Sequence, residues 1–188
     1  MRRFRLLATI AFSALLAFCF YSLSSVAAPL QAHKLDKAYF ASGCFWKTQY
    51  VFSKVPGVVS TVVGYTGGTL VNPTYEQVCS HATGHAEAVE IDFDPAKTNY
   101  HKLLEVLFSH HDPTTKNQQG PDIGDQYRSA IFYANDDQKK EASAYIAELT
   151  KAKRFPKPIV TLVVPSTKFY KAEDYHQNYF AKHGQVCQ

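Results

Sequence analysis

Polar and apolar residues alternate along several stretches of the chain, and this pattern predicts strands. The alternation is clear in 58–65 (VVSTVVGY) and in 85–94 (HAEAVEIDFD), as expected for strands with one buried face. The short and largely apolar stretches 38–42 and 128–134 predict two further strands.

Apolar residues spaced by three or four positions predict the helices. The stretch 45–55 predicts a helix that ends at Pro56-Gly57. A second helix follows the third strand, and its buried stripe is formed by Tyr100, Leu103, Leu104, Leu107 and Phe108. The order of elements is βαββαβ, which predicts an α+β fold with a ferredoxin-like core.

An additional helix and strand are expected after this core, at about 137–153 and at 159–164. Beyond Pro165 the chain is polar and aromatic, so we expect an irregular C-terminal tail. The sequence has 188 residues, with no internal repeat and no linker after its first 28 residues. Residues 29–188 are therefore predicted to form a single domain.

Residues 1–28 have the layout of a secretory signal peptide. Three arginines precede an apolar stretch that ends in the small residues around Ala27 and Ala28, after either of which we expect cleavage. The protein is then periplasmic or secreted. The alternative is an uncleaved signal that anchors the protein in the membrane, although the apolar stretch is short for a span.

Charge and cysteine content change when this signal is left out. The 20 basic residues become 17 against 16 acidic ones, so the formal net charge falls from +4 to +1. This balance gives no reason to expect nucleic-acid binding. Cys44, Cys79 and Cys187 remain, and an odd number in an exported chain leaves at least one thiol unpaired or cycling.

Cys44 is a candidate nucleophile because it follows the first predicted strand and opens the first predicted helix. The backbone amides and dipole of a helix N-terminus favour an anion there and lower the pKa of a thiol. The alternative is a small buried residue at a tight turn for which Gly43 supplies the conformation.

Glu87 is a candidate general acid because alternation places it on the same strand face as Val89, Ile91 and Phe93. Burial on this face raises the pKa of a carboxyl group and keeps it protonated near neutral pH. The alternative is a glutamate at the start of a strand that reaches solvent or pairs with a basic residue.

Tyr75 and Tyr127 lie in or beside segments rich in turn residues, where their hydroxyls can donate hydrogen bonds to a substrate oxygen. The histidine pairs suggest a metal, but His81 and His85 have no matched third ligand, and the adjacent pair 110–111 is expected to point in different directions. No metal site is therefore predicted, and His85 is expected to orient its neighbours or bind the backbone.

Five motifs occur here in an order and spacing that resemble those of the A class of peptide methionine sulfoxide reductases: GCFW, GYTGG, NPTYEQVCS, TGHAEAV and GDQYRSAIFY. The resemblance covers about Ala38 to Phe180. It implies a fold similar to a ferredoxin-like α/β roll and a monomeric enzyme without a cofactor. It also implies reduction of the S epimer of methionine sulfoxide, free or within oxidised proteins.

The resemblance also implies roles for individual residues. Cys44 is similar to the family nucleophile, which attacks the sulfoxide sulfur and becomes a sulfenic acid, and Glu87 to the acid that protonates the oxygen. Tyr75 and Tyr127 match the tyrosines that bond this oxygen, and Asp122 matches an aspartate that holds the substrate through its backbone.

Other parts of the site are implied in the same way. Phe45 and Trp46 resemble the aromatic wall that receives the substrate methyl group. Cys187 is the expected resolving thiol, because chain ends are mobile and many family members have a cysteine there. Cys79 is a possible second recycling thiol, and a thioredoxin-like protein is the implied reductant.

The chain departs from the family pattern directly after GCFW, where Lys47-Thr48-Gln49 replace the usual glycine, any residue and glutamate. Lys47 is mildly unfavourable near a helix N-terminus, but its charge would further stabilise a Cys44 thiolate.

Two other classes of function stay open at this point. A cysteine hydrolase would pair Cys44 with a histidine such as His85 or His176. A non-enzymatic exported binding domain would instead use Cys44 and Cys187 as a structural disulfide.

Overall fold

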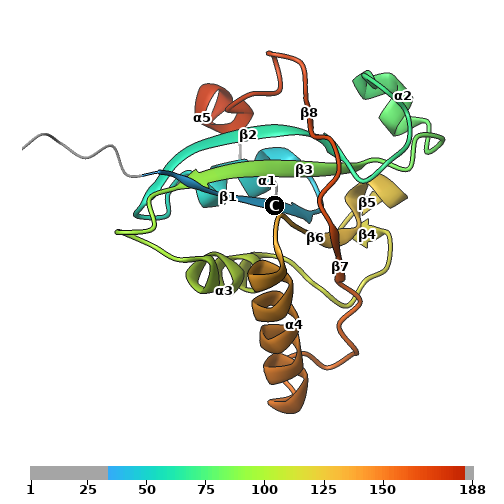
Figure 1. The fold of residues 1–188 in the computed structure, drawn as a ribbon. Coiled ribbons are helices and arrows are strands. Elements are labelled where there is room, and N and C mark those ends of the chain that lie inside the picture. Colours follow the sequence, from blue (N-terminus) through green and yellow to red (C-terminus); the bar gives the residue numbers. More distant parts are fainter. Residues whose placement is uncertain (1–33, 185–188) are drawn as a thin grey trace, which may run out of the picture. The chain divides into compact units, whose positions relative to one another are not determined.

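A six-stranded sheet organises the computed structural model, which describes residues 34–184 (Figure 1). Its strand order is β7-β6-β1-β3-β2-β8. Only β6 and β7 pair in parallel, and the other neighbours pair antiparallel. The strands are β1 (Asp36–Ser42), β2 (Val58–Thr66), β3 (Ala86–Phe93), β6 (Ser129–Tyr133), β7 (Leu162–Pro165) and β8 (Tyr170–Lys171).

Helices and a small hairpin connect these strands. The predicted βαββαβ order is confirmed in β1, α1, β2, β3, α3 and β6, with the short helix α2 inserted between β2 and β3. The hairpin pairs β4 (Gln118–Gln119) with β5 (Asp122–Ile123) and precedes a 3-10 helix, Asp125–Tyr127. The helices are α1 (Phe45–Phe52), α2 (Tyr75–Cys79), α3 (Tyr100–His110), α4 (Asp136–Lys151) and α5 (Tyr179–His183).

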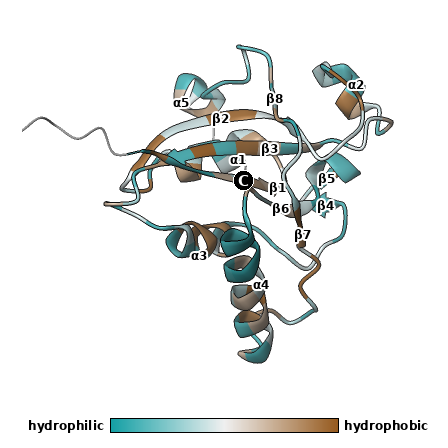
Figure 2. Cartoon of the chain, in the orientation of Figure 1, coloured by the Kyte–Doolittle hydropathy of each residue, from teal (hydrophilic) through white to brown (hydrophobic). Residues whose placement is uncertain are grey.

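The main core lies on the sheet face that carries Phe40, Val89 and Ile91. The predicted stripe of α3 is buried there, and apolar colour follows the central strands and α3 in Figure 2. A smaller cluster on the other face is made of four alanines and Phe132. Because β3 is buried on both faces at 86–89, Glu87 lies in an apolar environment, whereas Glu90 and Asp92 are partly exposed and pair with Lys37.

The C-terminal tail is largely irregular, as expected, but it contains two short elements. Residues 170–171 add β8 to the edge of β2 through Gly64 and Tyr65, and α5 follows. The Gln177 amide accepts from the backbone N–H of Val63 at 3.1 Å and donates to its carbonyl at 2.9 Å. Contacts with β2, rather than local periodicity, therefore give this segment its structure.

The turn that joins β1 to α1 requires a glycine. Gly43 has φ +89°, and a Cβ atom at this position would lie 2.5 Å from the Cβ of Gln119. A side chain would therefore both strain the backbone and collide with the hairpin. Within residues 34–184, no helix is long and apolar enough to cross a membrane. The expected signal peptide and Cys187 lie outside the described residues.

Candidate active site

Cys44 occupies the N-cap position of α1, directly after the Gly43 turn, and is partly exposed. Its carbonyl accepts the first helical hydrogen bond, from the N–H of Thr48 at 3.2 Å. The predicted strand-to-helix position is therefore confirmed. A thiolate here benefits from the positive end of the helix dipole.

Glu87 lies on β3 with only 2% of its surface exposed, so the alternative of a solvent-exposed glutamate is wrong. Its Oε2 accepts a hydrogen bond of 3.1 Å from the N–H of Phe45, the residue after Cys44. Burial, against the lowering effect of the Phe45 bond and with a smaller contribution from the charge of Asp122, raises the pKa of Glu87 to about 8. The carboxyl group is thus mostly protonated at pH 7, and because Oε2 accepts from Phe45, its proton belongs on Oε1.

Two tyrosine hydroxyls share the environment of this carboxyl group. Burial, followed by the charges of Glu87 and Asp122, raises the pKa of Tyr127. Cys79 and Cys44 raise it as well, so these groups lie within electrostatic reach of one another. Both hydroxyls stay protonated at neutral pH, since burial and a hydrogen bond with Cys79 also raise the pKa of Tyr75.

The tyrosine bond gives Cys79 a local partner. Its thiol is partly exposed, and burial raises its pKa, although the Tyr75 hydroxyl acts in the opposite direction. Cys79 is therefore a poorer thiolate than a cysteine at a helix N-terminus.

The two aromatic residues after Cys44 differ in exposure. Phe45 is 1% exposed, and its ring centroid lies 5.0 Å from that of His176. Trp46 is partly exposed. Its indole stacks on Tyr179 with 3.9 Å between centroids, and its Nε1–H donates to Nδ1 of His176 at 3.0 Å. These contacts fix the plane of the indole at the surface.

The C-terminal segment supplies Glu173, which the sequence interpretation missed, and His176, which it named only as a possible partner of Cys44 in a hydrolase. Glu173 accepts hydrogen bonds from the hydroxyl of Tyr65 at 2.8 Å and from the N–H of Tyr75 at 2.9 Å. His176 is 1% exposed, and burial lowers its pKa, so the ring is neutral and accepts from Trp46. The sequence signal for these two residues was the polar and aromatic stretch around EDYH, but the residues that they contact lie 98 to 130 positions earlier in the chain.

His85 is not available to Cys44 as a base. His85 accepts from the N–H of Gly68 at 3.1 Å through Nδ1 and donates to the carbonyl of Leu70 at 2.8 Å through Nε2. The prediction that His85 binds backbone is confirmed, and neither ring nitrogen is left to act as a base. In the part of the chain that the structure describes, no group of three metal-ligating side chains is found.

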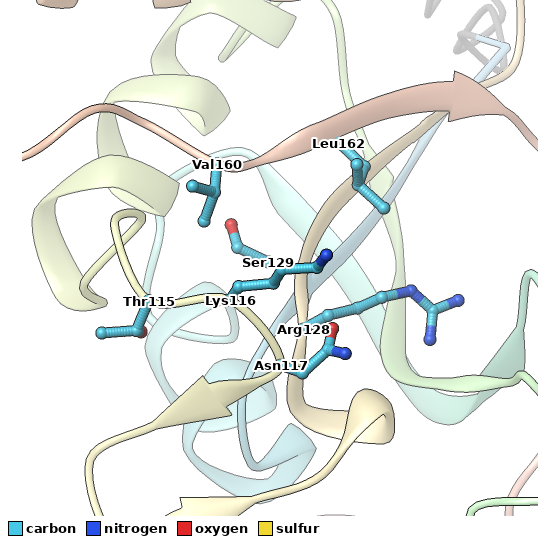
Figure 3. Close-up of a pocket in the computed structure, with 7 residues that line it drawn as sticks. All are labelled: Thr115, Lys116, Asn117, Arg128, Ser129, Val160 and Leu162. Atoms are coloured by element: carbon cyan, nitrogen blue, oxygen red, sulfur yellow. The ribbon is translucent and has the colours of Figure 1, made fainter.

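A separate pocket of about 250 Å³ lies beside the hairpin, at the start of β6 (Figure 3). Lys116 and Arg128 point toward one side of it, while Val160 and Leu162 reach it from the segment that includes β7. Arg128 follows Tyr127 in the chain, but none of the candidate site residues lines the pocket. This pocket is therefore separate from the candidate site around Cys44.

Comparison with known proteins identifies the same family that the sequence motifs resemble. Residues 36–188 match the model of the family described as peptide methionine sulfoxide reductase. A protein of Methanosarcina acetivorans named peptide methionine sulfoxide reductase MsrA is 59% identical over 150 residues, which are 80% of each chain.

Two solved structures are also similar. The reduced form of Mxr1 from Saccharomyces cerevisiae has a TM-score of 0.77 and 34% identity, and the match covers 82% of this chain and 89% of that one. Mxr1 in complex with Trx2 has a TM-score of 0.57 and 25% identity, with 82% and 91% covered. The hydrolase and the non-enzymatic alternatives are therefore wrong. The chain belongs to the A class of the peptide methionine sulfoxide reductase family and is an oxidoreductase with a mixed α/β fold.

Proposed function

We propose that the protein reduces the S epimer of methionine sulfoxide, within proteins or free, with Cys44 as nucleophile and Glu87 as general acid. One observation carries this assignment: a buried and protonated carboxyl group is bonded to the amide that follows the candidate nucleophile. An electron-rich thiolate and a proton donor are the two groups that removal of a sulfoxide oxygen requires.

In the first half-reaction the Cys44 thiolate attacks the sulfoxide sulfur, while Glu87 gives its proton to the sulfoxide oxygen. The oxygen passes to the cysteine sulfur and the sulfur–oxygen bond of the substrate breaks. The substrate sulfur gains two electrons and leaves as methionine. Cys44 loses two electrons and becomes a sulfenic acid.

The tyrosines and the aromatic residues are assigned to substrate binding. Tyr75 and Tyr127 stay protonated and so can donate to the sulfoxide oxygen as its negative charge grows. Phe45 and Trp46 form the apolar wall for the methyl group, in which the buried Phe45 supports the exposed indole. Asp122 holds the substrate through its backbone on β5.

In the second half-reaction a resolving thiol attacks the sulfenic acid and releases water. We assign this step to Cys187, which gives a Cys44–Cys187 disulfide, with Cys79 as the alternative thiol. The environment of Cys79 supports this order, because burial raises its pKa and so lowers its thiolate fraction.

A thioredoxin-type dithiol is the proposed reductant of this disulfide. The support is the relative Mxr1, whose complex with Trx2 has been solved. We also propose that residues 1–28 direct export to the periplasm or the medium and are then removed. Mass spectrometry of the mature N-terminus tests this, and an intact N-terminus in the secreted or periplasmic fraction contradicts removal.

The decisive experiment is dithiothreitol-driven reduction of the two separated sulfoxide epimers, with Cys44→Ser as the control. We expect reduction of the S epimer only, and none by the control variant. Equal rates with both epimers, or retained activity in Cys44→Ser, would overturn the proposal.

A further inference from the structure

A buried chain of side-chain hydrogen bonds runs beneath the turn that carries Cys44. Ser42 precedes the turn, Thr48 follows it one helical turn later, and their hydroxyl oxygens lie 2.8 Å apart. Ser42 is 4% exposed and Thr48 is 1% exposed. Because buried hydroxyl groups need partners, this bond links the two ends of the turn firmly.

His110, at the end of α3, is the last member of this series of hydrogen bonds and contacts Ser42. Its Nδ1 lies 2.7 Å from the carbonyl oxygen of Val106, which only accepts, so Nδ1 carries a proton. Its Nε2 lies 3.1 Å from the hydroxyl of Ser42. The ring also packs edge-on against Phe52, with 5.6 Å between centroids.

The protonation state of His110 fixes the direction of these bonds. Burial lowers its pKa, and the charge of Lys47 lowers it further, although the Val106 bond opposes both. His111 is the other titratable ring in contact with it, and it is neutral for the same reason, burial. Nε2 of His110 is therefore an acceptor, so Ser42 donates to it and Thr48 donates to Ser42.

The Thr48 hydroxyl also lies 3.2 Å from the carbonyl oxygen of Cys44, which accepts the Thr48 N–H as well. Its single proton is therefore shared in a bifurcated bond between Ser42, at 2.8 Å, and this carbonyl oxygen. Thr48 thus contacts the nucleophile's own peptide group and the hydroxyl two residues before it. Ser42 and Thr48 therefore hold the turn at its two ends, and His110 links them to α3. None of these three side chains belongs to the proposed substrate-binding groups.

We propose that Ser42, Thr48 and His110 are positioning residues for Cys44, which hold its peptide unit so that the thiolate attacks the sulfoxide from one fixed position. This inference rests on the proposed role of Cys44 as nucleophile. Displacement of a reacting group by about 1 Å can cost up to about a hundredfold in rate, so a loosened turn slows the chemical step. Substrate affinity is set by other residues and stays the same.

The test is the single-turnover burst of methionine without reductant, measured against substrate concentration. Thr48→Val keeps the shape without the hydroxyl, and His110→Leu removes the acceptor. We expect each to lower the limiting burst rate about tenfold, with half-saturation within about twofold of wild type. Thr48→Ser should restore the rate, and His101→Leu, at an exposed position of α3, should have no effect.

The double variant shows whether the hydrogen bonds of Thr48, Ser42 and His110 act as one network or whether each substitution lowers the rate independently. If the three residues act as one unit, Thr48→Val with His110→Leu is no slower than the slower single variant. A burst rate equal to the product of the two effects, or normal burst rates with only a lowered melting temperature, would overturn the proposal. If His110→Leu does not fold, the same cycle is run with Ser42→Ala and Thr48→Val.

These outcomes separate the inference from the proposed function. Loss of the wild-type burst, or a burst retained in Cys44→Ser, would contradict the proposed role of Cys44 as the nucleophile. A normal burst in wild type and in the Thr48→Val and Ser42→Ala variants would contradict only the positioning role, and Cys44 would remain the proposed nucleophile.

Discussion

The N–H of Phe45 donates a hydrogen bond of 3.1 Å to Oε2 of Glu87 and so joins the first turn of α1 to the middle of the sheet. One carboxyl oxygen is thereby occupied by the backbone beside the nucleophile, and the other holds the proton. The pKa of about 8 means that this proton is present at neutral pH.

Replacing Glu87 by glutamine keeps the size of the side chain but removes the transferable proton. We expect the burst rate at pH 7 to fall about a hundredfold or more, while half-saturation changes little. In wild type, loss of the proton as pH rises through about 8 should slow the burst, provided that Cys44 is already a thiolate. Rapid-quench measurements from pH 6 to pH 9 check both points, and an unaltered rate in Glu87→Gln would assign the proton to another group.

The same carboxyl group makes the stability of the protein depend on pH. Its pKa is higher in the folded protein than in the unfolded chain, so its stabilising contribution is fully present below about 4.5 and is lost as pH rises to about 8. In that interval we expect the free energy of unfolding to fall more steeply for wild type than for Glu87→Gln. The difference in slope should be at most about 1.4 kcal/mol per pH unit. Urea unfolding of both proteins at pH 5 and pH 8 measures this difference. An equal change in the free energy of unfolding for the two proteins would show that the pKa of Glu87 is not raised.

Gly43 and Gly120 provide a matched pair for testing the turn. Both have positive φ, but an added Cβ meets Gln119 at 2.5 Å at position 43 and meets nothing within 4 Å at position 120. Gly120→Ala should cost about 1 kcal/mol of stability, from backbone strain alone. Gly43→Ala should cost clearly more and also abolish the burst, because the Cys44 turn moves. Equal losses of stability in the two variants would mean that the hairpin moves to accommodate the added methyl group without disturbing the Cys44 turn.

His176 can be tested through Trp46, because the chain contains a single tryptophan. His176→Leu removes the acceptor of the indole N–H, so the indole should become more mobile. We expect a red-shifted fluorescence emission and an approximately tenfold higher half-saturating substrate concentration. His176→Asn places an oxygen close to the position of Nδ1 and should restore both. An unchanged spectrum in His176→Leu would show that stacking on Tyr179 alone fixes the indole.

Cys187→Ser should still release about one methionine per enzyme, because Cys44 and Glu87 complete the first half-reaction without it. Further turnover with a thioredoxin-type donor should be lost, because such a donor attacks disulfides. Peptide mapping of wild type after one turnover should find Cys44 joined to Cys187. A bridge to Cys79, together with normal cycling of Cys187→Ser, would transfer the resolving role to Cys79.

The parts of the site that follow local rules were predictable from the sequence. Alternation along β3 fixed the face of Glu87, and the change from strand to helix located Cys44. The short elements were not predictable, because α2 and α5 have only five residues each and carry no complete period. The role of Glu173 and the contact of His176 with Trp46 were missed for a different reason. Their roles come from Tyr65, Tyr75 and Trp46, which no local pattern connects to the tail.

The docking of the tail on Trp46 and Tyr75 also sets the time at which activity can arise during synthesis. Cys44 leaves the ribosome early, whereas Glu173, His176 and Tyr179 emerge only after about 130 further residues have been made. A nascent chain therefore displays a thiol whose aromatic wall is not yet held in place. Any truncated product that lacks this segment would keep the cysteine but lose the contacts that hold the indole, so we expect it to bind substrate more weakly than the full chain.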